Sequence, residues 1–157
     1  MKEYIKINSI YKRDMTKKNN PFIIGEYSEP EFEYLKDNQW EFSEKIDGTN
    51  IRVMLNGDDI VFGGKTDNAQ IPAHLYTRLS ELFSTIDKKK LLHEIFGEDW
   101  KDVCLYGEGF GYKIQGKVGI DYLVDSVDLC LFDGMIVTGK HLSNLLQISH
   151  VITSFYL

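Results

Sequence analysis

The chain has few of the residues that mark secreted, fibrous or membrane proteins. Its 157 residues include only two cysteines and three prolines, too few for a disulfide framework or a proline-rich disordered segment. Its apolar runs span a handful of residues, far below the roughly 20 needed to cross a bilayer, and its first residues lack the apolar core of a signal peptide. We therefore expect a cytoplasmic protein without membrane partners, in which Cys104 and Cys130 are reduced.

Positive charge is also scarce. The 18 Lys and Arg residues are outnumbered by 24 Asp and Glu residues, which gives a net charge of −6. The whole-molecule field repels a polyanion, so any contact with nucleic acid must come from a local patch. The apolar content of 43% and the length are typical of one globular domain. We expect a single domain over residues 1–157, with an arm over 1–20 and an atypical tail over 143–157.

Strand patterns dominate both ends of the sequence and helical patterns its middle. The apolar spacing after Pro72 predicts a helix to residue 86, and a second helix is expected over 87–97. Alternation predicts strands over residues 4–11, 40–44, 51–55, 60–62, 103–108, 113–122 and 127–132, with a polar loop over 12–20 and a hairpin turn over 56–59. This order of elements predicts an α+β fold built on antiparallel sheets. In the later strands, alternation groups Cys104, Tyr106 and Glu108 on one face, and Asp128, Cys130 and Phe132 on one face.

The segment Lys45-Ile-Asp-Gly-Thr-Asn50 lies between two predicted strands. A lysine held in a tight loop beside a carboxylate is a nucleophile when its amine is unprotonated, and Gly48 lets a phosphate approach the backbone. The tetrapeptide Lys-x-Asp-Gly alone also fits a turn that ends a strand and exposes its lysine. Its chemical meaning therefore depends on the motifs that accompany it.

Four further segments resemble, in order, motifs of the covalent nucleotidyltransferases, the superfamily of polynucleotide ligases and mRNA capping enzymes. Lys45–Asn50 resembles the nucleophile motif, and Thr49-Asn50 is closest to the RNA ligase branch. The other matches are Ile7-Asn-Ser-Ile-Tyr11, Gly63-Gly-Lys-Thr-Asp-Asn-Ala-Gln70, Leu105-Tyr-Gly-Glu-Gly-Phe-Gly111 and Leu129-Cys-Leu-Phe-Asp133. The resemblance covers roughly residues 4–142 and implies the adenylation domain of an ATP-dependent RNA ligase, with DNA joining and RNA capping as alternatives within the class.

The resemblance implies a role for each matching residue. Lys45 would attack the α-phosphorus of ATP to form a lysyl-AMP, and the AMP would pass to an RNA 5′-phosphate before a 3′-hydroxyl displaces it. Phe132 would stack on adenine, and Arg52 would contact phosphate or RNA. Asp47 and Glu108 would hold Mg²⁺, since hard cations prefer oxygen ligands. The remaining nucleotide-binding positions would be Glu44, Asp47, Gly48, Asn50, Lys65 and Glu108.

Each of these residues also has an ordinary structural interpretation. Phe132 fits a buried core position, Glu108 fits a turn cap between glycines, and Arg52 fits a charge on a strand surface. The Gly107-Glu-Gly-Phe-Gly111 run lacks the spacing of a dinucleotide-binding loop and fits the bulged end of a strand.

The sequence departs from the family pattern in two places. Lys65 stands where the family usually has arginine, whose planar fork can hold two oxygens at once. After Phe132-Asp133-Gly134 we find neither the second metal-binding glutamate strand nor the lysines that bind the α-phosphate. We therefore expect an incomplete domain with impaired adenylylation, completed by a second copy or a complementing C-terminal chain. The alternative is a non-catalytic module that binds nucleotide or RNA ends.

Overall fold

The chain divides into two compact units. The computed structural model describes residues 3–57, 59–84, 90, 94, 100–116, 122–138 and 142–146. Unit 1 comprises Met1–Tyr4 and Lys45–Leu157, and unit 2 comprises Ile5–Glu44. Most of the arm predicted over residues 1–20 lies in unit 2, together with residues 21–44.

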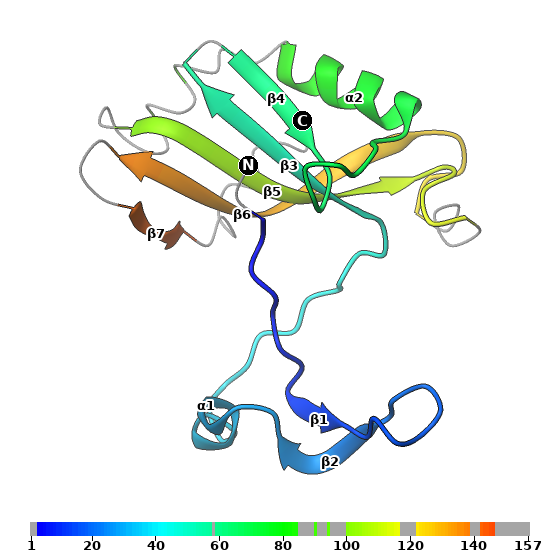
Figure 1. Ribbon diagram of the computed structural model, residues 1–157, viewed down its shortest axis with the longest axis vertical. Coiled ribbons are helices and arrows are strands. Elements are labelled where there is room, and N and C mark those ends of the chain that lie inside the picture. The colour runs from blue at the N-terminus through cyan, green and yellow to red at the C-terminus, as the bar shows by residue number, and fades with distance from the viewer. Residues whose placement is uncertain are drawn as a thin grey trace. The chain divides into compact units, whose positions relative to one another are not determined.

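Unit 1 is built on a five-stranded antiparallel sheet in the order β4-β3-β5-β6-β7. The strands span Thr49–Asn56 (β3), Asp59–Gly63 (β4), Trp100–Gly111 (β5), Val127–Thr138 (β6) and Leu142–Leu146 (β7), and helix α2 spans Ala73–Ser84. Figure 1 shows α2 beside β4, lying along the sheet. The predicted α+β class with antiparallel pairing is confirmed.

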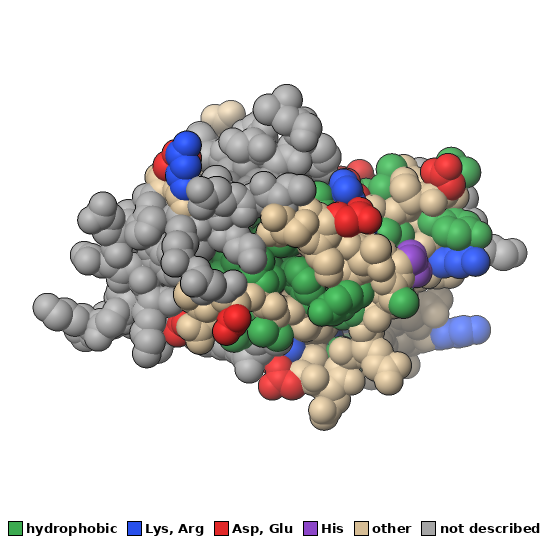
Figure 2. Space-filling model, turned by 90° about the horizontal axis from the view of Figure 1, so that it is seen from above, with side chains coloured by type: hydrophobic (Ala, Val, Ile, Leu, Met, Phe, Trp, Pro, Cys, Tyr) green, Lys and Arg blue, Asp and Glu red, His purple; other side chains and the backbone are tan. Residues whose placement is uncertain are grey.

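One face of this sheet and one side of α2 form the core. Helix positions four residues apart lie on one side of a helix, and Leu75, Leu79 and Phe83 at this spacing are all buried. They join a single cluster with the alternate residues of three strands, Ile51, Val53, Leu55, Val103, Leu105 and Leu131. Figure 2 views the molecule from the side of β4 and α2 and shows apolar side chains gathered in the middle of the described surface. The helix predicted after Pro72 is therefore confirmed, with the buried side that the spacing indicated.

Unit 2 contains a two-stranded antiparallel sheet and a short helix. Its elements are β1 (Tyr11–Arg13), β2 (Phe22–Tyr27) and α1 (Pro30–Tyr34). The predicted strands over 4–11 and 40–44 are wrong. Only Tyr11 of the first range is in a strand, and residues 40–44 form no regular element. The Trp40 indole donates to the Leu35 carbonyl at 3.0 Å.

The remaining predicted elements of unit 1 have mixed outcomes. The strands expected over 51–55, 60–62, 103–108 and 127–132 are confirmed within β3, β4, β5 and β6. The strand expected over 113–122 is wrong at 113–116, which form a turn in which Lys113 and Gln115 have positive φ. Residues 117–121, nearly all of the helix expected over 87–97, and residues 147–157 of the expected tail lie outside the described residues.

The described helices are short. Within the described ranges, none combines the length and the apolar character needed to cross a lipid bilayer.

Candidate functional site

The loop that carries Lys45 is packed tightly against β5. Gly48 is buried, and a Cβ atom at this position would lie 2.3 Å from the Gly109 carbonyl oxygen and 3.0 Å from Cγ of Glu108. Real Cβ atoms do not approach backbone oxygen so closely, so only glycine allows this path of the loop. The sequence thus brings the Lys45 loop directly onto the strand that carries Glu108.

Two distant side chains hold the same loop from outside the sheet. The Asp47 backbone N–H donates to the Tyr122 hydroxyl at 3.1 Å, and the Gln115 side-chain amide donates to the Gly48 carbonyl at 2.7 Å. These partners lie 75 and 67 residues further along the chain. No local pattern relates them to the loop, which explains why sequence reasoning missed both.

Glu108 lies in the electrostatic field of this loop. Burial raises the pKa of the Glu108 carboxyl, and the Lys45 charge and the Gly48 N–H, which donates to it, act in the opposite direction. The Asp47 carboxylate raises the pKa further. Lys45 and Asp47 are therefore close enough to act electrostatically on the Glu108 carboxyl, although Lys45 itself is exposed.

Strand register sets which side chains share a face with Glu108. Direct cross-strand partners point to the same side of a sheet, and Glu108 of β5 pairs with Asn50 of β3 and Cys130 of β6. The sheet face opposite α2 thus collects Asn50 and Glu108 beside the Lys45 loop. The alternation predicted for Cys104, Tyr106 and Glu108 agrees with this register.

A bulge in β6 brings Asp133 onto the face that also carries Phe132. Tyr106 pairs with Asp133, but the next residue of β5, Gly107, pairs with Leu131, which leaves Phe132 as the extra residue. Leu131 is buried on the core side. Phe132 and Asp133 therefore both point to the face that carries Glu108.

The bulge also holds an aromatic residue from the start of the chain. The Tyr4 ring lies 4.9 Å from the Tyr106 ring and 5.1 Å from the Phe132 ring, the latter in an edge-on arrangement. Its hydroxyl donates to the Asp133 carboxylate at 2.8 Å. Burial, together with this carboxylate, raises the pKa of Tyr4 to about 12, so the hydroxyl remains a donor well into alkaline solution. Sequence reasoning missed Tyr4, which lies 129 residues from its partner.

Arg52 is an internal residue and not a surface charge. Its side chain is fully buried, and its guanidinium donates to the Gly64 carbonyl at 2.6 Å and to the Asp67 carboxylate at 3.0 Å. This hydrogen bond holds the pKa of Asp67 below its usual range. Arg52 thus fixes the loop after β4, on which Lys65 is exposed.

The structure brings the central part of the expected set together. Lys45, Asp47, Gly48 and Glu108 meet in one place, and Asn50 joins them through strand register. Lys65 is exposed on the loop after β4 that Arg52 holds, and it follows Gly64, whose Cβ position lies 3.7 Å from the Asn50 carbonyl oxygen. Glu44 is exposed and is the last residue of unit 2.

Two carboxylates near the loop are the candidate ligands for a divalent cation. The described residues contain no group of three or more His, Cys, Asp or Glu side chains that could hold a metal. Asp47 and Glu108 are nevertheless two carboxylates near enough to repel each other. Mg²⁺ typically binds one or two protein carboxylates and completes its shell with water and substrate phosphates.

No protein-family model matches the chain, and a comparison with curated proteins finds no match.

The raised pKa of Glu108 predicts a pH-dependent effect on stability. A carboxyl whose folded-state pKa lies above its unfolded value loses stabilising free energy as the pH rises through the folded pKa. We expect Glu108→Gln to be more heat-stable than the wild type at pH 8, with the difference vanishing near pH 4. Calorimetric melting of both proteins from pH 4 to pH 8 measures this difference in melting temperature. A difference that instead grows as the pH falls would contradict the burial of the carboxyl.

Proposed function

We propose that unit 1 binds ATP and transfers AMP to Lys45 as the first step of joining RNA ends. The observation that supports this most directly is the contact of Glu108 with the Lys45–Asn50 loop. A nucleophilic lysine needs a fixed loop, nearby groups that orient the nucleotide, and a backbone that lets phosphate approach. The Gly48 packing and the two loop anchors supply the first of these.

In the proposed step the unprotonated Lys45 amine attacks the α-phosphorus of ATP. An Nζ–P bond forms while the bond from phosphorus to the pyrophosphate oxygen breaks, and the amine releases a proton to solvent. The adenylate would then move to an RNA 5′-phosphate, and a 3′-hydroxyl would displace AMP. Positioning and charge neutralisation dominate such reactions.

The residues on the same face would hold the nucleotide. Glu108 and Asn50 would contact the ribose, and Phe132 would stack on the base. Asp47 and Glu108 would hold Mg²⁺, which neutralises phosphate charge when it is bound. Lys65 would contact sugar or phosphate from its own loop, while Arg52 keeps that loop in place.

The test is covalent labelling. The full chain is incubated with Mg²⁺ and ATP labelled in the α-phosphate, and label on the protein is measured after denaturation. We expect weak label on the wild type alone and stronger label when a complementing C-terminal ligase fragment is added. Lys45→Ala should show none above background in either case, and Lys36→Ala, at an exposed lysine of unit 2, should match the wild type. ATP labelled in the γ-phosphate should leave no label, because pyrophosphate departs.

Two results would overturn the proposal. Equal label on the wild type and Lys45→Ala would place the chemistry elsewhere. Absence of label in every arm, with a complementing C-terminal ligase fragment also supplied, would exclude the transfer. Calorimetric ATP binding without label would then identify a non-catalytic nucleotide-binding module.

A further inference from the structure

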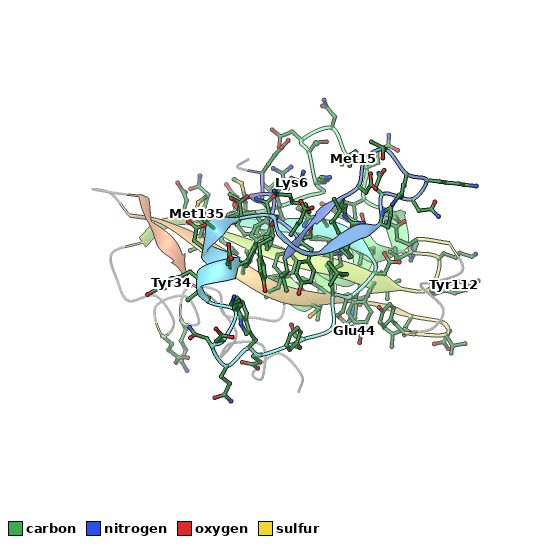
Figure 3. All side chains as sticks on the ribbon, turned by 90° about the horizontal axis from the view of Figure 1, so that it is seen from below. Lys6, Met15, Tyr34, Glu44, Tyr112 and Met135 are labelled. Carbon is green, nitrogen blue, oxygen red and sulfur yellow. The ribbon has the colours of Figure 1, made fainter. Side chains whose placement is uncertain are left out.

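The charges of unit 2 are divided along its sequence. Residues 5–20 contain five basic residues and one acidic residue, whereas residues 21–44 contain seven acidic residues and one basic residue. Figures 1 and 3 show the loop that carries Met15 at one end of unit 2 and α1, with Tyr34, at the other. A chain of net charge −6 therefore has a concentrated positive end within this unit.

The loop between β1 and β2 is ordered by its own hydrogen bonds. The Asp14 N–H donates to the Pro21 carbonyl at 2.9 Å, and Asn19 and Asn20 adopt positive φ at the far end of the loop. The Asp14 carboxylate accepts from the Thr16 N–H and hydroxyl at 3.0 and 2.6 Å. The one carboxylate of residues 5–20 is thus engaged within the turn and only 20% exposed.

The basic side chains of β1 and of the loop that follows it face solvent. Lys12 and Lys17 are 57% and 71% exposed, and Lys18 is exposed as well. Lys12 lies 3.9 Å from Glu26 and Lys17 lies 3.2 Å from Asp14, but exposed pairs of this kind contribute little and leave both charges accessible. Their positive potential is therefore available to a partner.

A cation and an aromatic ring are combined next to these lysines. The Arg13 guanidinium lies over the Phe22 ring at 4.1 Å from its centroid and donates to the Asn20 carbonyl at 3.1 Å. Phe22 remains 45% exposed, and Met15 at the loop tip is 73% exposed. Flat cations and exposed rings beside lysines are the groups that hold single-stranded nucleic acids, through phosphates and unstacked bases.

We propose that the basic hairpin, defined as Lys12, Arg13, Lys17, Lys18 and Phe22, is a binding surface for single-stranded nucleic acid. The lysines contact successive phosphates, and Phe22 with Arg13 offers a stacking platform for a base. An anionic membrane would use the lysine charges alone, whereas the exposed Phe22 ring stacked with Arg13 adds a flat surface that suits an unstacked base. This surface belongs to unit 2. The binding proposal can therefore be tested separately from the chemistry proposed for Lys45.

The experiment compares two variants of equal charge change. Lys17→Gln/Lys18→Gln removes two charges from the basic hairpin, and Lys36→Gln/Lys113→Gln removes two exposed charges elsewhere. Binding of a fluorescent single-stranded RNA to the full chain is measured without ATP over a series of salt concentrations. We expect about tenfold weaker binding for the hairpin variant, with a salt slope reduced by about 1.4, because each phosphate contact on a single strand contributes roughly 0.7. The control variant should retain the wild-type slope.

Further arms separate stacking, nucleic-acid type and membrane binding. Phe22→Leu should weaken RNA binding more than heparin binding, since heparin has no bases to stack. Comparing the affinities for single-stranded DNA and RNA tests whether the surface contacts the ribose 2′-hydroxyl. Equal losses in both double variants, no binding by the wild type at low salt, or preference for anionic lipid vesicles over RNA would overturn the proposal. Covalent labelling of Lys45 should be unchanged in Lys17→Gln/Lys18→Gln, which distinguishes the two proposals.

Discussion

Gly48→Ala is expected to lower the free energy of unfolding by about 3 kcal/mol, at the upper end of the range for overpacking a tight contact. The added methyl group would meet the Gly109 carbonyl oxygen at 2.3 Å and Cγ of Glu108 at 3.0 Å. Backbone oxygen cannot move aside as a flexible side chain does, so the loop must leave β5. Urea denaturation measures the loss of stability, and we expect ATP binding to fall with it.

The matched control is Gly57→Ala in the turn between β3 and β4. Gly57 has φ +56 and open space around its missing Cβ, so alanine there adds only the conformational cost of about 1 kcal/mol. ATP binding should be retained in this variant. Equal stability losses at the two positions would show that Gly48 does not pack on β5.

Arg52→Met is expected to cost about 3 kcal/mol of stability, the upper end of the range for a buried acceptor that loses its donor, because it removes the fully buried guanidinium that donates to the buried Gly64 carbonyl. Methionine preserves most of the chain length, so the loss reports on the polar contacts. Urea denaturation measures the stability, and hydrogen exchange of residues 64–69 measures how far the loop is released. The pKa of Asp67 should rise toward its usual value, because the Arg52 hydrogen bond lowers it.

Two companion variants make this result specific. Arg52→Lys keeps the charge but lacks the planar fork that reaches two acceptors, so it should fall between the wild type and Arg52→Met. Asp67→Asn keeps an acceptor at an exposed position, where 64% of the side chain is accessible, and should change stability little. Wild-type stability in Arg52→Met would contradict the internal role of Arg52.

The sequence predicted the half-buried elements and missed the exposed ones. Residues 51–55 alternate because one face of β3 packs on α2, and the Leu75, Leu79 and Phe83 spacing reports the same core. In unit 2, β2 has only two partly buried residues in six, so its sequence carries no alternation to detect. The bulge at Phe132 adds one residue to β6, so residues after it alternate out of step with those before it. A prediction that assumes strict alternation along the strand cannot detect this change.

The candidate site could be predicted only in its local part. The Lys45–Asn50 loop and Glu108 stand out by residue type, and the structure brings them together. Gln115, Tyr122 and Tyr4 reach the site through contacts that span 67 to 129 residues. The burial of Arg52 depends on the path of a separate loop, so its charge alone suggested a surface position.

The division into units has a consequence for chain entropy. Tyr4 is held by Phe132 and Asp133 of β6, and the chain returns to unit 1 at Lys45, near Glu108 of the neighbouring strand β5. Residues Ile5–Glu44 are thus an insertion, and its two ends must be brought together when unit 1 folds, which costs chain entropy. Closure cost rises by only about 0.6 kcal/mol for each doubling of loop length. Shortening the insertion from 40 residues to about 10 would therefore recover only about 1.2 kcal/mol, so unit 1 bears the insertion of unit 2 at small entropic expense.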